Sequence, residues 1–286
     1  MKDIHTMIHS KNIQTNKKTE KSDSILICPI CGDDLLINED SGQKNFSCKN
    51  NHSFDRAKSG YLNLSHKQKV SGDNKDMVLA RTRFLEEGYY SFMADEVINL
   101  LKKLHPENLI DIGCGEGWYT RQFSKYADHT YGVDLSKEAI LHASKNDNKT
   151  QYIVASIYRL PFRADSADVI VSIFTPIPEE EIYRVLKPGG TFISVSPGVM
   201  HHYELKEVLY DKVRLNDEPV RLDRLKKAEV LKSSLKVHVK DPMSLLDMTP
   251  YRYKCPKEGL QRLEEKKDGL NVTFDFIISV YRKEAE

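Results

Sequence analysis

Cysteine and tryptophan are scarce in this chain, and neither sign of charge prevails. Among 286 residues there are five cysteines and one tryptophan, and 43 basic against 42 acidic residues leave a formal net charge of +1. This balance excludes a uniform polycation, so any contact with nucleic acid must be local. No stretch reaches the roughly 18 uninterrupted apolar residues of a membrane span. No apolar signal core opens the chain, so we expect a cytoplasmic protein without a membrane partner.

Three of the few cysteines nevertheless fall within one short stretch, residues 28–52. The stretch reads C-x2-C, then a gap of 16 residues, then C-x3-H, and Gly32 follows the first pair. In a reducing cytoplasm such spacing indicates metal before disulfide. Three thiolates and one imidazole on two tight turns suit a tetrahedral zinc ion that stabilises a small domain. The sequence therefore predicts structural Zn²⁺ held by Cys28, Cys31, Cys48 and His52.

The chain divides into four parts by composition and apolar period. Residues 1–23 are polar and predict a disordered tail. Residues 24–65 hold the cysteine cluster among short β-like runs, as in a zinc ribbon. Residues 66–105 read as a polar linker and a helical segment, with helical apolar spacing over 77–104.

Strands and helices alternate over residues 106–286, and the alternating segment 271–282 predicts a further strand. This order predicts an α/β fold with a doubly wound, mostly parallel, Rossmann-like sheet.

The segment LIDIGCGEGW, residues 109–118, predicts a strand, a G-x-G-x-G turn and a helix. A dinucleotide turn would more usually run G-x-G-x-x-G. The acid two residues before the first glycine suits an amino group, and the acid ending the next strand suits ribose hydroxyls. Ribose without pyrophosphate points to S-adenosylmethionine. The cofactor site predicted here comprises Asp111, Gly113, Asp134, Leu135 and Ser156.

The chain resembles the 23S rRNA (guanine-N1) methyltransferases, a family that includes macrolide-resistance methylases. The resemblance runs from about residue 25 to the end. Its most specific parts join the zinc ribbon to FDRAKSGYLNL (54–64) and ARTRFLEEGYY (80–90). Further matches are LIDIGCGEGWYT (109–120), GVDLSKEAI (132–140), ASIYRLPF (155–162), VLKPGG (185–190), SPGVMHHYELK (196–206) and MTPYRYK (248–254).

The resemblance implies a class I methyltransferase fold at residues 106–286 and a zinc-binding RNA-recognition domain at 24–65. It implies that N1 of a guanine in a hairpin of 23S rRNA is the target, and it suggests a homodimer. The cofactor contacts that it implies are Tyr90, Gly115, Glu116, Gly117, Trp118, Tyr119, Thr120 and His201. Trp118 stands where the family often has Tyr or His. His202 replaces the family's usual leucine, which leaves open which of the two histidines faces the site.

The chemistry requires that the proton on guanine N1 be removed, or that the developing anion be stabilised. By residue type or position, candidates for the base are His201, His202 and Asp165, and none is assigned. The segment FTPIP, residues 174–178, follows the fourth strand. It reads equally well as a feature suited to a ring-nitrogen target and as a proline-closed loop.

Basic residues that could hold RNA phosphates lie in two regions. Residues 221–240 carry seven Lys or Arg and two acids, and YRYK at 251–254 could stack a base. Around the ribbon the candidates are Lys49, Arg56, Lys58, Lys67, Lys69 and Lys75. A solvated charged face is the alternative for both regions.

Two other functions stay open from the residues alone. A small-molecule methyltransferase would share the fold but would not need the ribbon or the basic stretches. A non-catalytic zinc RNA-binding protein would not need the intact glycine turn. Fold by itself does not decide among them.

Overall fold

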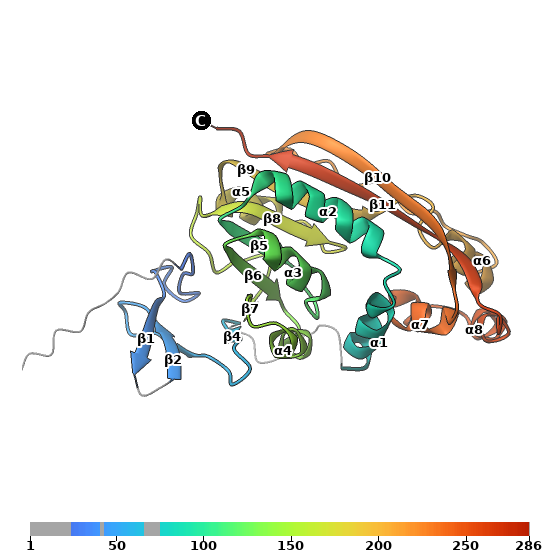
Figure 1. Ribbon diagram of the computed structural model, residues 1–286, viewed down its shortest axis with the longest axis horizontal. Coiled ribbons are helices and arrows are strands. Elements are labelled where there is room, and N and C mark those ends of the chain that lie inside the picture. The colour runs from blue at the N-terminus through green and yellow to red at the C-terminus, as the bar shows by residue number, and fades with distance from the viewer. Residues whose placement is uncertain (1–23, 41–42, 66–74, 286) are drawn as a thin grey trace, which may run out of the picture.

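The computed structural model describes residues 24–40, 43–65 and 75–285 (Figure 1). The predicted tail at residues 1–23 lies outside these ranges, as do two of the predicted RNA-contacting lysines, Lys67 and Lys69.

The main body is an eight-stranded sheet in the order β10-β11-β9-β8-β5-β6-β7-β4. Six strands run parallel, while β11 is antiparallel to β9 and β10 is antiparallel to β11. This arrangement confirms the predicted α/β fold and the predicted C-terminal strand. The bounds are β4 (Leu62–Asn63), β5 (Asn108–Ile112), β6 (His129–Asp134), β7 (Gln151–Val154), β8 (Ala167–Ile173), β9 (Leu186–Pro197), β10 (Lys226–Val239) and β11 (Leu270–Arg282).

Both faces of the sheet are covered at its centre, so β5 is buried along its whole length and β8 along nearly all of it. Along β8, Val169 and Val171 pack with α2 and α3, whereas Ile170 packs on the opposite face with α5. The helices are α1 (Lys75–Glu86), α2 (Ser91–Leu104), α3 (Trp118–Phe123), η1 (Ser124–Tyr126), α4 (Lys137–Asn146), α5 (Glu179–Val185), α6 (Tyr203–Leu209), α7 (Pro242–Asp247), η2 (Pro250–Tyr253) and α8 (Lys257–Glu264).

The N-terminal ribbon is a small antiparallel sheet of β1 (Leu36–Asp40), β2 (Gln43–Ser47) and β3 (Ser53–Asp55). Its flanks join the main body: β4 pairs with β7, and Leu26 forms a bridge to Phe162. Leu26, Leu62 and Phe162 are buried in one shared core. Burying each such side chain contributes about 1.5–3 kcal/mol, so ribbon and sheet stabilise each other.

The segment predicted as one helix over residues 77–104 is two helices. Gly88 interrupts it with φ +81°, a left-handed conformation that ends α1 and that glycine adopts without strain. Tyr90 then directly precedes α2 and is buried. The break therefore turns a tyrosine of a helical segment toward the carboxyl edge of the sheet.

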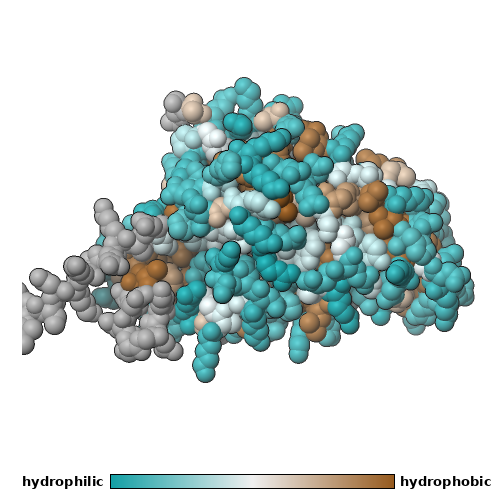
Figure 2. Space-filling view, viewed as in Figure 1, coloured by the Kyte–Doolittle hydropathy of each residue, from teal (hydrophilic) through white to brown (hydrophobic). Residues whose placement is uncertain are grey.

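The face seen in Figure 2 is mainly hydrophilic, with hydrophobic residues in scattered groups. Among the described residues, no helix is both long and apolar enough to cross a membrane.

Candidate functional site

Four side chains of the ribbon converge as the sequence predicted. The ligand atoms of Cys28, Cys31, Cys48 and His52 all lie within 4.8 Å of one another. His52 Nδ1 lies 3.5 Å from Cys28 Sγ and 3.4 Å from Cys48 Sγ, and the sulfurs of Cys31 and Cys48 are 3.6 Å apart. Tetrahedral zinc with bonds near 2.0–2.3 Å requires ligand separations of about 3.3–3.8 Å. The donor set and its spacing therefore fit a closed structural zinc site.

Two tight turns present these ligands. Gly32 has φ +79° and donates its N–H to Cys28 O at 2.8 Å. Asn51 has φ +62° and donates to Cys48 O at 3.0 Å. Glycine and asparagine tolerate the left-handed region best, so the sequence supplies the right residue at each turn.

Polar neighbours support the exposed ligand Cys31. Its sulfur lies 3.4 Å from an oxygen of Asp33, which also pairs with Lys49 at 2.7 Å. A side-chain hydrogen bond from Asn50, aided by the backbone N–H of Asp33, lowers the pKa of the Cys31 thiol to about 7. The thiolate is the metal-binding form, so the hydrogen bonds from Asn50 and from the backbone N–H of Asp33 favour metal binding near neutral pH.

A cavity of about 880 Å³ opens at the carboxyl ends of the central strands. This is the edge where open α/β sheets bind ligands. Eight predicted cofactor residues line it: Tyr90, Asp111, Gly113, Gly115, Glu116, Tyr119, Asp134 and His201.

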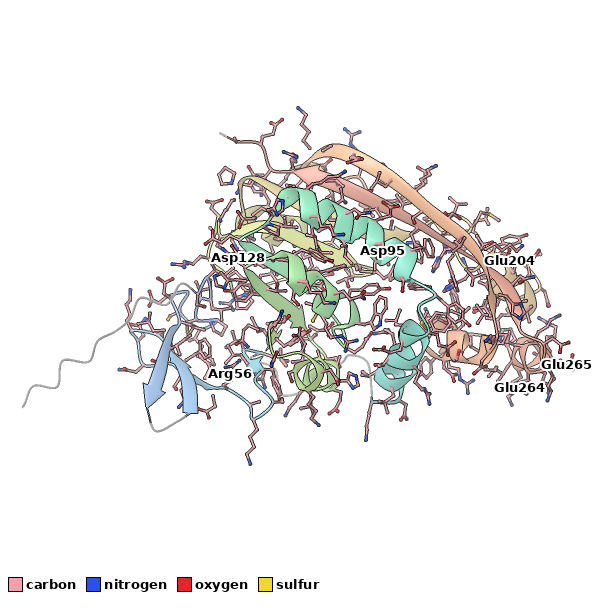
Figure 3. All side chains as sticks on the ribbon, in the orientation of Figure 1. Arg56, Asp95, Asp128, Glu204, Glu264 and Glu265 are labelled. Atoms are coloured by element: carbon pink, nitrogen blue, oxygen red, sulfur yellow. The ribbon has the colours of Figure 1, made fainter. Side chains whose placement is uncertain are left out.

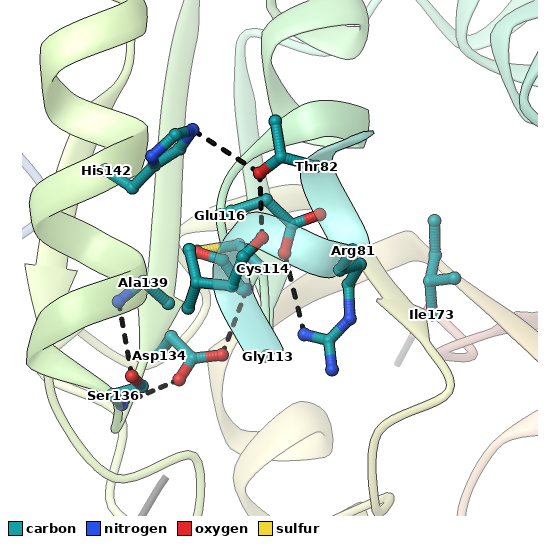
Figure 4. Close-up of polar contacts among 12 residues, drawn as sticks. Arg81, Thr82, Gly113, Cys114, Glu116, Asp134, Ser136, Ala139, His142 and Ile173 are labelled. Carbon is teal, nitrogen blue, oxygen red and sulfur yellow. Dashed lines mark hydrogen bonds and ion pairs between the residues drawn. The ribbon is translucent and has the colours of Figure 1, made fainter. Parts of the chain in front are cut away.

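Three carboxylates meet beside the glycine turn. Asp134 accepts the N–H of Gly115 at 3.0 Å and that of Ser136 at 2.7 Å, so it holds the turn in place. The carboxylate of Glu116 faces the guanidinium of Arg81 at 3.5 Å (Figure 4). Asp111 is only 2% exposed. Such a group of acids favours a cationic ligand.

Burial is the main cause that raises the pKa of Asp111 to about 7; the hydrogen bond from Thr120 opposes the rise, and the carboxylates of Asp134 and Glu116 add to it. That hydrogen bond runs from Thr120 Oγ1 to Asp111 Oδ2 over 2.6 Å. A nearby positive charge would restore the ionised form, so Asp111 is suited to hold an ammonium group.

Tyr90 and two histidines form a polar chain inside the cavity wall. The Tyr90 hydroxyl lies 2.7 Å from His202 Nε2 and 3.5 Å from His201 Nε2, and the two imidazole rings stack at 3.8 Å. Burial, with Lys206 nearby, lowers the pKa of His201 to about 3. Burial also lowers the pKa of His202 well below its ordinary value. Both rings are therefore neutral at physiological pH.

The tautomer of His201 follows from its backbone partner. The N–H of Asp275 donates to His201 Nδ1 at 3.2 Å, so the ring proton sits on Nε2 and faces Tyr90. Tyr90 then donates its hydroxyl proton to His202 Nε2. Neither histidine keeps a free lone pair in this chain, so the pair orients Tyr90 and is poorly suited to act as a base.

The third base candidate lies elsewhere. Asp165 stands before β8, at the amino end of that strand, and pairs with Lys283 at 2.6 Å. It does not line the cavity at the opposite end of the strand.

Five predicted cofactor residues do not line the cavity either. Trp118 packs into the core beside α2, and Thr120 reaches the site only through Asp111. Gly117 lies where an added Cβ would come within 2.6 Å of the Tyr152 hydroxyl. Leu135 and Ser156 are half-buried beyond the ends of β6 and β7. Direct contacts from these five to a cofactor stay predictions.

Two family models match the chain: "Methyltransferase domain" over residues 110–194 and "RlmA, N-terminal" over 26–69. A candidate 23S rRNA (guanine-N(1)-)-methyltransferase of Bacillus subtilis (strain 168), YxjB, is 29% identical over 90% of this chain and 97% of that protein. A 23S rRNA (guanine(748)-N(1))-methyltransferase of Streptomyces fradiae is 31% identical over 64% of this chain and 67% of that protein. The chain belongs to the RlmA-type 23S rRNA guanine-N1 methyltransferase family.

Family membership confirms two cofactor predictions. The C-terminal part is an S-adenosylmethionine-dependent methyltransferase domain, and the ribbon carries a Cys3His zinc site. The cavity fits this cofactor on its own chemistry. The Asp111 carboxylate, whose pKa is raised by burial and by two neighbouring acids, matches the ammonium group, and the carboxylate of Asp134 at the end of β6 matches ribose hydroxyls.

Sequence reasoning missed several residues of this RlmA-type cavity. Arg81 comes from α1 and is identified only by its ion pair with Glu116. Residues 217–222 line the cavity from a segment without regular structure between α6 and β10. Asn216 ties one end of this segment to Gly198 O at 2.8 Å, and the backbone N–H of Arg224 ties the other to Glu179. No sequence pattern identifies residues 217–222 as part of the site, because the position of this segment follows from tertiary contacts alone.

The pKa of Asp111 predicts how cofactor affinity depends on pH. Only the ionised carboxylate holds a cation, so affinity should rise up to tenfold per unit as pH rises toward about 7, and then level off. Calorimetry of S-adenosylmethionine binding between pH 5.5 and 7.5 measures this slope. Repeating it in buffers of different ionisation heat detects the proton that Asp111 releases on binding.

Asp111→Asn should bind weakly with a flat pH profile, while Asp95→Asn, on the exposed side of α2 (Figure 3), should behave as the wild type. The raised pKa also means that the folded ligand-free state keeps a proton that the unfolded state loses. Stability should therefore fall as pH rises from about 4 to 7, and Asp111→Asn should remove that fall. An unchanged slope in Asp111→Asn would show that another group sets the pH dependence.

Proposed function

We propose that this protein transfers a methyl group from S-adenosylmethionine to N1 of a guanine in a hairpin of 23S rRNA. The observation that carries the proposal is the likeness to the Streptomyces fradiae guanine-N1 methyltransferase, 31% identical over 67% of that enzyme. An RlmA-type ribbon on the same chain supports an RNA substrate over a small molecule.

The cofactor, when bound, supplies a methyl group activated by the sulfonium. The residues of the chain bind the cofactor, orient it toward the target base and shield the site from water. Asp111 would hold the ammonium group and Asp134 the ribose, while Tyr90, fixed by its two histidines, would shape the wall beside them. The target base must leave its stack to enter the cavity, which costs least in a loop.

Basic residues on the surface would hold the RNA backbone. Lys227 and Lys232 on β10, which forms the edge of the main sheet, are exposed, as is Lys58 beside the ribbon. Each lysine that contacts a phosphate adds affinity that falls as salt rises. Lysines of the ribbon region and of β10 would thus bind the phosphates of RNA whose target base enters the cavity.

The decisive test maps reverse-transcriptase stops on 23S rRNA from cells with and without the gene. A methyl on N1 blocks base pairing, so a stop at a hairpin guanine that needs the gene supports the proposal. In parallel, purified protein is given labelled S-adenosylmethionine with 23S rRNA, a hairpin fragment or a panel of small molecules. Label in a small molecule alone would favour the alternative function.

Two finer parts of the proposal follow the resemblance and need their own tests. If the methylation confers macrolide resistance, the inhibitory concentration of macrolides should be higher in cells with the active gene than in cells without it. A homodimer would give twice the mass of one chain in sedimentation.

Loss of zinc should weaken RNA binding more than cofactor binding. In Cys31→Ser one of four ligands is lost, so bound zinc should fall well below one ion per chain by atomic absorption. The ribbon should then loosen, and RNA affinity should fall about tenfold or more, since several phosphate contacts depend on its position. S-adenosylmethionine affinity should stay within about threefold, because no zinc ligand lines the cavity.

Cys255→Ser supplies the matched control. Cys255 is half-buried and lies outside the ribbon, so its exchange should change neither zinc content nor RNA affinity. Equal RNA affinity in zinc-free Cys31→Ser and in the control would refute a role of the ribbon in RNA binding.

A further inference from the structure

Phe174 is an apolar ring that the fold leaves partly uncovered inside the cofactor cavity. It directly follows β8 and lines the cavity, yet it is 43% exposed. Its remaining surface packs against other rings: Phe276 at 5.7 Å, His201 at 6.0 Å and Tyr90 at 6.3 Å between ring centroids. An uncovered aromatic face in a largely apolar cavity that also holds a few polar groups is a typical ligand-binding surface.

The backbone of Phe174 is strained. Its φ is +55°, a left-handed conformation that a bulky side chain rarely adopts. Its N–H donates to Val195 O at 3.0 Å on β9, and this bond together with the ring contacts keeps it there. Strain that the surroundings enforce at an exposed position indicates that the side-chain direction serves function.

The next residue ties Phe174 to the glycine turn. Thr175 Oγ1 lies 3.4 Å from Gly113 O, which it can reach as a donor. An added Cβ on Gly113 would lie 2.1 Å from that same hydroxyl oxygen, so turn and loop are in direct contact. Phe174 is therefore the direct neighbour of the residue that contacts the turn, and this turn would hold the methyl donor. A surface that positions the methyl acceptor has to lie this close to the donor.

We propose that Phe174 forms the stacking surface for the target base, and that its strained backbone aims the ring at that base. The inference rests on the proposed function and extends it by naming the residue that receives the guanine. A planar aromatic base that has left its helix gains most from an uncovered ring of this kind. Tyr251 lines the same cavity, but its ring already has two neighbours: Lys206 Nζ lies 5.9 Å over the ring, and His202 packs edge-on against it at 6.1 Å. Phe174 is therefore the better stacking surface.

The test compares Phe174→Ala, Phe174→Tyr and Phe174→Gly in the full chain. Phe174→Ala should lower kcat/KM for methyl transfer to the hairpin about 10- to 100-fold, as loss of one stacked base does. S-adenosylmethionine affinity, measured by calorimetry, should stay within about twofold. Phe174→Tyr keeps the ring and should keep activity within about threefold. Phe174→Gly removes ring and strain together, so it should be as inactive as Phe174→Ala but melt at a higher temperature than Phe174→Ala, which keeps the left-handed strain.

A hairpin with 2-aminopurine in place of the target guanine reports stacking directly. Its fluorescence should be quenched by the wild type and by Tyr251→Ala, and should stay bright with Phe174→Ala. Full methylation by Phe174→Ala, quenching that needs Tyr251 instead, or a melting temperature in Phe174→Gly no higher than that of Phe174→Ala would each overturn the inference. A wild type that leaves guanine N1 unmodified would instead overturn the proposed function.

Discussion

Asp134→Ala should weaken the binding of S-adenosylmethionine about 100-fold or more while the protein stays folded. The carboxylate makes two backbone hydrogen bonds in the ligand-free site, to Gly115 N–H at 3.0 Å and to Ser136 N–H at 2.7 Å. The substitution therefore removes both the predicted ribose partner and the clamp on the glycine turn. Hydrogen bonds to a charged group contribute about 1.5–3 kcal/mol each, so affinity should fall about 100-fold or more. Calorimetry measures the affinity, and circular dichroism checks the fold.

Asp128→Ala is the matched control for this experiment. Asp128 precedes the same strand at its other end, is exposed and lies away from the cavity (Figure 3). It should leave cofactor affinity unchanged. Asp134→Asn should fall between the two, because its amide oxygen can still accept one N–H but its NH₂ group cannot accept the second. Wild-type affinity in Asp134→Ala would mean that the cofactor binds elsewhere.

The sequence predicted best where chemistry and spacing coincide. Cys28, Cys31, Cys48 and His52 meet as predicted, because two short turns with Gly32 and Asn51 determine the ligand geometry locally. The acids at the carboxyl ends of β5 and β6 line one cavity for a similar reason, since parallel neighbours bring their ends to one edge.

What the sequence could not provide depends on contacts between distant segments. β10 reads as a basic stretch because its outward residues are charged, and only its pairing with β11 identifies it as a strand. The cavity-lining segment at residues 217–222 has no local sequence pattern at all. The roles of His201 and His202 follow from a tautomer that the N–H of Asp275, some 70 residues away in the sequence, determines.

Gly113→Ala should eliminate methyl transfer by separating the glycine turn from the loop after β8. Gly113 has φ +71°, and an ideal Cβ there would lie 2.1 Å from Oγ1 and 2.8 Å from Cβ of Thr175. Rotation of Thr175 cannot relieve the second contact, so backbone must move. A left-handed alanine costs about 1–2 kcal/mol and overpacking typically adds 1–3 kcal/mol. Melting temperature should therefore fall by about 5 °C or more, and calorimetry should detect no cofactor binding.

Gly189→Ala separates the two causes, because Gly189 has φ +79° with no atom within 4 Å of an added Cβ. It carries the backbone strain alone and should bind cofactor normally with only a small loss of stability. Thr175→Gly combined with Gly113→Ala removes the clash, and its double-mutant cycle gives the coupling energy. If contact between turn and loop is the cause, the double variant should regain much of the cofactor affinity that Gly113→Ala loses. If affinity stays lost, the alanine acts through the turn's own conformation, and the loop that carries Phe174 does not support the cofactor site.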